Sequence, residues 1–109
     1  MSNNKIFSGT TASRYSLALY ELADEQNIIN EIENHSIAIL KLISESSDFN
    51  QLIKDPTNTQ ENLNSVMLKI SEYFNLNSLL AKFLSFLISK RRFFYIENIL
   101  HDFVDTCSK

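Results

Sequence analysis

The sequence of 109 residues contains very few of the residues that build turns: one glycine, Gly9, and one proline, Pro56. A globular chain of this length ordinarily carries about a dozen of the two together. A fold rich in β-strands needs a turn roughly every 8–12 residues, usually built with these residues. Their scarcity, together with a high content of leucine, isoleucine, lysine and glutamate, argues against a β-rich fold and favours an all-α protein.

Residues that carry chemistry are also scarce. Cys107 is the only cysteine, so no disulfide forms within the chain, and no histidine is placed in the sequence to activate its thiol. His35 and His101 are isolated, without a second ligand at metal-binding spacing. A chain with one glycine also lacks the glycine-rich loop that binds nucleotide phosphates. We therefore expect no metal site, no cofactor and no catalytic activity.

The charge balance is slightly acidic, with a formal net charge of −3 and an isoelectric point near 5.3. Nonspecific binding to nucleic acid depends on a basic surface, so we expect no nucleic-acid partner. The short basic run at residues 90–92 is interpreted as cations that oppose the dipole at the end of a helix.

No run of about 18 apolar residues occurs, so we expect no direct insertion into a membrane. Residues 1–10 resemble neither a signal peptide nor a transit peptide.

Apolar residues make up 44% of the chain and recur at helical spacing. The pattern predicts six helices joined by short connections, near residues 12–26, 28–45, 49–54, 63–74, 78–89 and 93–107. Asn77 is expected to cap the fifth helix, and Pro56 to end the third, because the residue before a proline is biased away from the α conformation. We expect residues 1–11 to form a mobile tail and residues 12–109 to fold as one compact bundle.

Two of the predicted helices carry apolar surface that suits another helix. One face of the first helix is apolar but low in relief, and is formed by Tyr15, Ala18, Leu19, Leu22 and Ala23. The fifth helix is apolar around most of its circumference, which is typical of a helix that is buried on several sides or offers its spare face to a partner. We expect the fifth helix to lie centrally, with the first helix beside it. This pattern predicts binding rather than chemistry.

Three segments carry a family resemblance. Residues 12–23 (ASRYSLALYELA) are similar to an Arg-x-Tyr-Ala-x-Ala-Leu helix, and residues 52–56 (LIKDP) to a short helix that ends at a proline. Residues 82–92 (KFLSFLISKRR) are similar to an Asn-Phe-Leu-x-Leu-Leu-x-x-Asn-x-Arg run, with lysines at both asparagine positions. In this order and spacing, the segments resemble the N-terminal domain of the delta subunit of F-type ATP synthases. In mitochondria this subunit is called the oligomycin-sensitivity-conferring protein.

The resemblance implies a non-catalytic subunit of the peripheral stalk, which ties the catalytic head to the stalk and resists the torque of the rotor. In the family, the N-terminal helix of one α subunit lies in a groove between the first and fifth helices. Carried over by position, this predicts a partner-binding groove formed by Arg14, Tyr15, Ala18, Leu22, Leu79, Leu80, Phe83, Leu84 and Leu87. Tyr15 is the strongest candidate for a binding hot spot, because its ring is apolar and its tip is polar.

The resemblance also implies a second partner and a location. The b subunit of the stalk binds a C-terminal region of the full subunit, and this chain ends before that region, so we expect it to be a fragment. The lack of a transit peptide favours a peripheral subunit on the cytoplasmic face of a bacterial inner membrane. A processed organelle protein would instead lie on the matrix or stroma side.

Other functions remain open at this stage. The run Ala18-Leu19-Tyr20 also resembles the first helix of the all-α NusB antitermination family, in which an arginine-rich helix helps to bind RNA. Here Arg14 is the only arginine of that helix, and an acidic group that we interpret as a solvated face follows it. A general helical adaptor would use the same groove for a different partner. Each apolar side chain of the groove could also belong to an ordinary core.

Overall fold

The computed structural model describes residues 11–108. In that range every regular element is helical, and short connections join the helices. The elements are α2 (Thr11–Glu25), α3 (Ile29–Glu45), α4 (Ser47–Lys54), α5 (Gln60–Phe74), α6 (Ser78–Ser89), the 3-10 turn η1 (Phe93–Tyr95) and α7 (Ile96–Cys107). The predicted all-α bundle is therefore confirmed, including the bounds of the fifth helix. The tail predicted for the N-terminus falls almost entirely at residues 1–10, outside the described residues.

Side-chain caps explain where three of the helices begin. Ser46, Thr59 and Asn77 precede α4, α5 and α6, and each side-chain oxygen accepts a hydrogen bond of 2.8–3.2 Å from a backbone N–H two or three residues further on. Such a bond satisfies one of the N–H groups that have no partner within the helix. α5 ends at Asn75, which has a positive φ of 54°, and α4 ends before Pro56. The predicted cap at Asn77 is confirmed.

The connection between α6 and α7 differs from the predicted one. We predicted that the last helix begins at Phe93, but Phe93 lies in η1 and α7 begins at Ile96. α6 closes with a hydrogen bond of 2.8 Å from the Arg92 N–H to the Leu87 carbonyl, and Arg91 between them has a φ of 59°. The periodicity is unaffected by this turn, because Phe93 still packs into the core.

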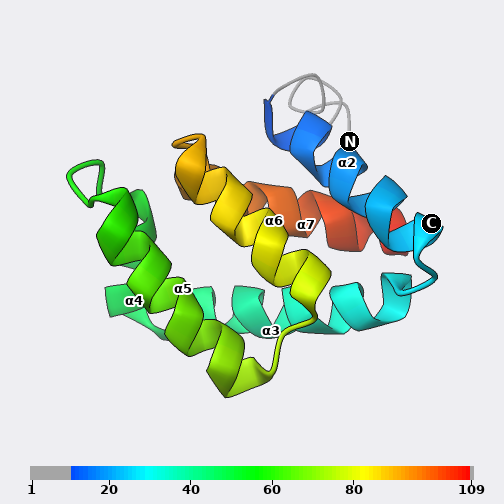
Figure 1. Ribbon diagram of the computed structural model, residues 1–109, viewed down its shortest axis with the longest axis horizontal. Coiled ribbons are helices and arrows are strands. Elements are labelled where there is room, and N and C mark those ends of the chain that lie inside the picture. Colours follow the sequence, from blue (N-terminus) through cyan, green and yellow to red (C-terminus); the bar gives the residue numbers. More distant parts are fainter. Residues whose placement is uncertain (1–10, 109) are drawn as a thin grey trace.

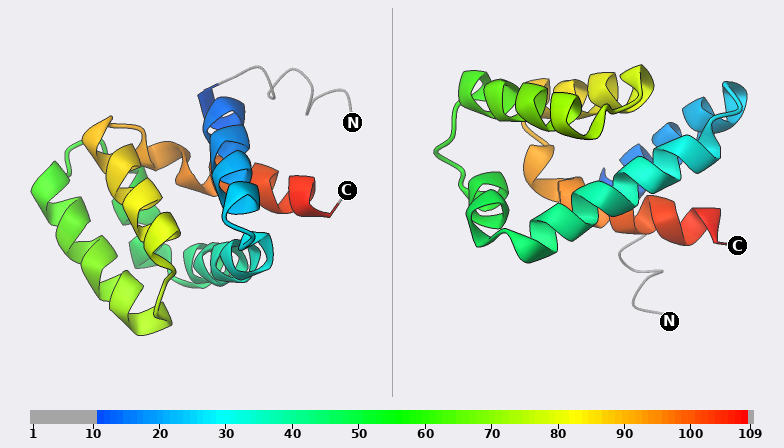
Figure 2. Two further views of the ribbon diagram at one scale, coloured as in Figure 1. Left: turned by 45° about the vertical axis from the view of Figure 1, so that its right-hand side comes forward. Right: turned by 90° about the horizontal axis from the view of Figure 1, so that it is seen from below.

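The helices form two layers, which the view from below in Figure 2 separates. α5 and α6 lie together as one layer, and α3 and α7 lie in the other. α6 crosses in front of α7 at the centre of the view in Figure 1, while α2 packs chiefly against α7 and α3. The expectation that the first helix packs beside the fifth therefore needs correction, because α2 reaches α6 mainly through one aromatic side chain.

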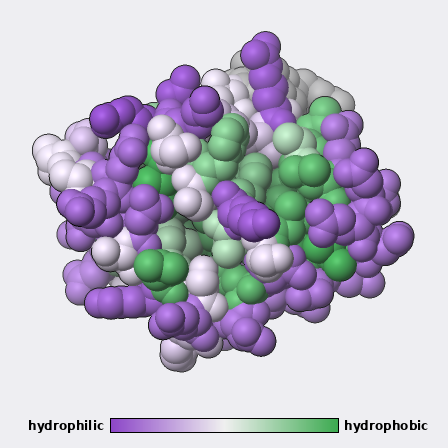
Figure 3. Space-filling model, in the orientation of Figure 1, coloured by the Kyte–Doolittle hydropathy of each residue, from purple (hydrophilic) through white to green (hydrophobic). Residues whose placement is uncertain are grey.

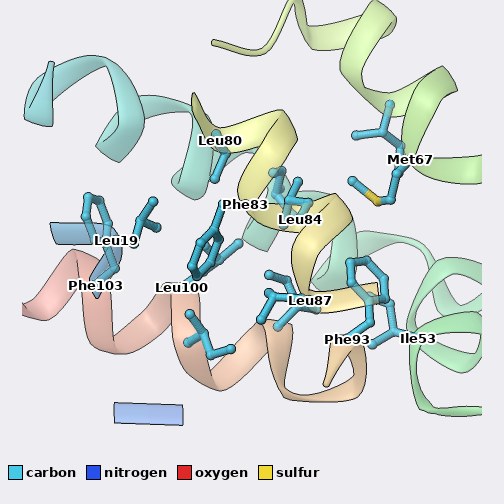
Figure 4. Close-up of a cluster of buried hydrophobic side chains, with 14 of the residues drawn as sticks. Leu19, Ile53, Met67, Leu80, Phe83, Leu84, Leu87, Phe93, Leu100 and Phe103 are labelled. Carbon is cyan, nitrogen blue, oxygen red and sulfur yellow. The ribbon is translucent and has the colours of Figure 1, made fainter. Parts of the chain in front are cut away.

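The core lies where α6 and α7 face each other (Figure 4). Its large side chains that are less than 2% exposed are Leu19, Ile32, Ile39, Ile43, Leu80, Leu84, Leu87, Ile88, Ile96, Ile99, Leu100 and Phe103. Burial of one such side chain contributes about 1.5–3 kcal/mol to stability. α6 supplies five buried apolar residues from twelve positions, and this accounts for its nearly all-round apolar character.

A polar connection fixes the start of α6 on α3. The backbone N–H of Asn77 donates a hydrogen bond of 3.2 Å to Nδ1 of His35, and the Asn77 amide donates one of 3.0 Å to Glu31. His35 therefore has a structural partner rather than a metal-binding one. One residue of this helix is less well satisfied: Ser36 is buried, and its hydroxyl has no hydrogen-bond partner among the described residues.

Candidate partner-binding surface

The apolar face predicted for α2 is divided in two. The residues that face the core are Ala12, Ser16, Leu19 and Ala23. Ala18 and Leu22, which the sequence pattern grouped with Leu19 and Ala23, are exposed, and 40% of Leu22 is accessible. At 100° per residue, Ala18 and Leu22 lie on the side of the core stripe that faces α6. α2 therefore has a separate row of apolar residues that its own core does not use.

Tyr15 marks the boundary between the core of α2 and this exposed row. It is half-buried and makes edge-to-face contacts with two aromatic rings of α6. The ring centroids lie 6.5 Å from Phe83 at an interplanar angle of 73°, and 6.1 Å from Phe86 at 66°. These are the distances and angles that aromatic pairs prefer. Tyr15 thus connects two helices whose backbones otherwise pack against different neighbours.

α6 presents a matching row toward α2. Leu79 is half-buried, Phe83 is buried with 7% of it exposed, and Phe86 is 45% exposed. We call the two rows together the α2–α6 surface, and define it by Tyr15, Ala18, Leu22, Leu79, Phe83 and Phe86. Figure 3 shows hydrophobic side chains gathered over the part of this face where α6 and α2 lie, with hydrophilic residues around them. The sequence placed both of these helices in one groove, and the structure brings their exposed apolar residues to one face.

Three leucines of the predicted groove do not lie on that surface. Leu80, Leu84 and Leu87 are at most 1% exposed. They belong to the buried hydrophobic cluster, part of which Figure 4 shows. Their position on the opposite side of α6 from Phe86 explains this, since a helix cannot present all of its faces to one partner. These three leucines hold α6 in place within the core.

Phe86 was missing from the predicted groove, although the sequence carries a signal for it. Leu79, Phe83 and Phe86 follow the i, i+4, i+7 pattern of one helix face. Lys90 lies one turn further, with its Nζ 5.7 Å from the centre of the Phe86 ring. At that distance a cation is attracted to the face of an aromatic ring. Phe86 is therefore the most exposed aromatic residue of the surface, and its ring also contacts a basic side chain.

Exposed charges surround the α2–α6 surface. Arg14 precedes Tyr15 on α2, and Lys82 and Lys90 flank Phe86 on α6. At the other end of α2, an exposed acidic group consists of Glu21, Asp24 and Glu25. Within residues 11–108 the one ion pair joins Lys54 to Glu97, so none of these surrounding charges is paired there. A partner helix with charges of both signs would find opposite charges at this rim.

The remaining candidate groups do not form a chemical site. Burial and the nearby Glu33 carboxylate raise the pKa of the Cys107 thiol, whereas a nucleophilic cysteine needs a lowered one. His101 is exposed at the surface of α7. No group of three histidine, cysteine or acidic residues in the described part of the chain is placed to hold a metal ion. None of the described helices is both long enough and apolar enough to span a bilayer.

Comparison with known proteins identifies relatives of one kind. Residues 11–109 match the family model of the ATP synthase delta (OSCP) subunit. The chain is 64% identical over 108 residues to the ATP synthase subunit delta of Pelagibacter ubique. That alignment covers 99% of this chain and 58% of that protein. It is 32% identical over 94 residues to the subunit delta of Magnetococcus marinus, and that alignment covers 86% of this chain and 51% of that protein. The chain thus spans between half and three-fifths of the length of these relatives.

The fold has a counterpart among solved structures. A chain of the cryo-EM structure of the Toxoplasma gondii mitochondrial ATP synthase hexamer superimposes with a TM-score of 0.81. The match covers 86% of this chain and 52% of that chain, at 18% identity, and at this identity it establishes the shared fold alone. The relatives give no support to the RNA-binding alternative. With the family match over residues 11–109, they show that this chain belongs to the ATP synthase delta (OSCP) subunit family.

Proposed function

We propose that this chain is the part of a delta subunit that attaches the peripheral stalk of a proton-translocating F-type ATP synthase to its catalytic head. It acts as a non-catalytic stator element, at the cytoplasmic face of a bacterial membrane. Membership of the family and the bacterial relatives support this proposal. The single observation that carries the binding role is the α2–α6 surface, on which exposed apolar side chains from two helices face one side.

The proposed partner at this surface is the amphipathic N-terminal helix of an α subunit. The rows from Tyr15 to Leu22 and from Leu79 to Phe86 each extend about 10 Å at 1.5 Å per residue. Two parallel rows of that length accept about two turns of a helix, whose anchors recur at i, i+3, i+4 and i+7. Ala18 leaves room for a larger side chain of the partner between Tyr15 and Leu22. Arg14 and Lys90 would contact acidic residues at one end of that helix.

The second proposed partner, the b subunit, would bind outside this chain. The relatives are nearly twice as long as the matched region, so a further region of the full subunit is available for that contact. In this arrangement residues 12–109 form the unit that binds the head, and the remainder of the subunit joins it to the membrane-anchored stalk. The stator then has two separate attachments, as resistance to torque requires.

A calorimetric titration tests the partner at the α2–α6 surface. The 109-residue chain is titrated with a peptide of about 20–25 residues from the N-terminus of the matching α subunit, enough for several helical turns. We expect saturable binding with one peptide per chain. Leu22→Asp places a charge in the surface and should weaken binding at least about tenfold, or about 1.4 kcal/mol.

Leu17→Asp is the matched control for this experiment. Leu17 is a leucine of the same helix, 56% exposed, and lies about 140° around the helix from Leu22. The same substitution there should leave the affinity unchanged within about twofold. Equal losses for the two variants, or no binding by a folded chain, would contradict the proposed site and would favour a helical adaptor with another partner.

A further inference from the structure

A cavity of about 420 Å³ lies at the opposite end of the molecule from the α2–α3 turn. It is formed by the end of α4, the start of α5, the end of α6 and η1. Its floor is apolar and consists of Ile53, Leu63, Ile88 and Phe93, of which Ile53 and Phe93 lie next to each other in Figure 4. Cavities of this volume and apolar character are typical of small-molecule sites. None of the residues of the α2–α6 surface lines it.

Arg91 lies at the rim of this cavity in an unfavourable backbone conformation. Its φ of 59° is in the left-handed region, at the position after α6 where glycine is usual. For other L-residues this conformation costs about 1–2 kcal/mol. The chain nevertheless has an arginine here, and this residue is among those that line the cavity. The position is therefore occupied by a charged residue although the backbone favours glycine.

The other charged groups at the rim already have partners. Lys54 lies 3.6 Å from the carboxylate of Glu97. Asp55 accepts hydrogen bonds from the hydroxyl of Thr57 at 2.7 Å and from its backbone N–H at 2.9 Å, and these lower the pKa of the Asp55 carboxyl. Arg91 has no carboxylate partner among residues 11–108. Among the described residues that line the cavity, Arg91 is therefore the cation without an anionic partner.

An exposed aromatic ring completes the mouth of the cavity. Phe94 is 53% exposed and stacks on Tyr95, with centroids 4.3 Å apart and planes inclined by 29°. The stack holds one face of Phe94 in position for a flat apolar group. A strongly hydrated anion such as phosphate would find no use for this ring or for the apolar floor. An uncharged apolar molecule would make no use of Arg91, which is exposed at the rim.

We propose that this cavity binds a small aromatic carboxylate. Its apolar body would lie on Ile53, Leu63 and Phe93, and its carboxylate would accept hydrogen bonds from the Arg91 guanidinium. Planar bidentate recognition of a carboxylate is the interaction for which arginine is best suited. The site is independent of the α2–α6 surface and gives the chain a second function, the binding of a free small molecule at the turn between α6 and α7.

The test is an NMR titration of the 109-residue chain with 2-naphthoate, and with 2-naphthamide as the uncharged analogue. We expect saturable shifts of the amides around the cavity, with a Kd of about 1 mM or tighter for a ligand of this size. 2-Naphthamide should bind about fivefold more weakly, because it does not form the charged hydrogen bond. Absence of saturable shifts at the cavity, or equal affinities for the two compounds, would overturn the proposal.

Variants at two neighbouring arginines separate a specific site from general charge attraction. Arg91→Gly removes the guanidinium and suits the left-handed backbone, so the fold is retained. It should weaken 2-naphthoate binding about fivefold and leave 2-naphthamide unaffected. Arg92→Gln removes an adjacent charge that does not line the cavity, and should leave both affinities within about twofold. An unchanged affinity in Arg91→Gly, or an equal loss in Arg92→Gln, would also overturn the proposal.

Discussion

Tyr15 of α2 meets Phe86 of α6 edge to face, with ring centroids 6.1 Å apart and an interplanar angle of 66°. Phe86 remains 45% exposed on its other side and carries Lys90 near its ring. The same pair therefore joins α2 to α6 and leaves an aromatic ring exposed to solvent. Stability and the proposed partner binding therefore depend on the same contact, and substitutions there should affect both.

Tyr15→Ala removes the aromatic contacts with Phe83 and Phe86 and part of the α2–α6 surface. We expect the free energy of unfolding to fall by about 1–3 kcal/mol, since the ring is half-buried, and the affinity for the α-subunit peptide to fall by more than about 1 kcal/mol. Tyr15→Phe keeps the ring and should retain most of both. Urea unfolding and calorimetry measure the two effects. A variant with unchanged affinity would remove Tyr15 from the site.

Asn77→Ala removes the cap of α6 and the side-chain hydrogen bond to Glu31. The loss of a cap and of an exposed hydrogen bond should lower the free energy of unfolding by about 1–2 kcal/mol. Asn64→Ala, at an exposed position within α5, is the control and should change it by less than about 0.5 kcal/mol. Equal effects of the two substitutions on urea unfolding would show that the cap at Asn77 is not a stabilising contact.

Arg91→Gly should stabilise the chain. Glycine adopts the positive φ of this position without the steric cost, while its more flexible unfolded state offsets part of the gain. The expected increase in the free energy of unfolding is about 0.5–1 kcal/mol, measured by urea or thermal unfolding. Arg92→Gly, at a φ of −115°, should give no such increase. A loss of stability in Arg91→Gly would indicate that the arginine side chain itself holds the turn.

The reactivity of Cys107 should respond to Glu33. Burial, and secondly the Glu33 carboxylate, raise the pKa of this thiol. Glu33→Gln should lower that pKa and shift the pH dependence of alkylation by iodoacetamide to lower pH, because the thiolate is the reactive form. Glu45→Gln, at the far end of α3, is the control. An alkylation profile that Glu33→Gln leaves unchanged would show that burial alone raises the pKa.

The raised pKa of Cys107 also gives the sign of a pH effect on stability. The folded chain holds this proton more tightly than the unfolded chain does. The resulting contribution is fully present below the ordinary cysteine pKa of about 8.5, and is lost as the pH rises through the folded-state pKa. Cys107→Ser should therefore reduce the loss of stability in alkaline solution. If Cys107→Ser loses as much stability in alkaline solution as the unsubstituted chain does, this assignment is contradicted.

The sequence was sufficient for the order and bounds of most helices, because periodicity and caps are local properties. Asn77 illustrates this, since a capping side chain before an apolar run predicts a helix start without any tertiary information. The predicted start of α7 was wrong. The chain turns at Arg91, and an arginine has no intrinsic preference for the positive φ that this turn requires. Phe93 packs into the core directly after that turn, and no local pattern signals the turn.

The candidate surface could be predicted only in part, because periodicity identifies apolar residues but does not divide them between core and surface. On α2 the core uses the small residues Ala12 and Ser16, which a search for large apolar side chains passes over. This rotates the core stripe and exposes Leu22. On α6, periodicity likewise could not tell a core residue from a surface residue. The prediction therefore included Leu84, which is buried, and left out Phe86, which is 45% exposed.

The central claim is that the α2–α6 surface binds the N-terminal helix of an α subunit, and NMR mapping of that complex tests it most directly. The isotope-labelled chain is titrated with the α-subunit peptide and the shifted amides are assigned. The account predicts saturation at one peptide per chain, with the largest shifts on α2 and α6 around Ala18, Leu22 and Phe86. Saturation with the shifts centred on another face, or no shifts in a folded chain, would contradict it.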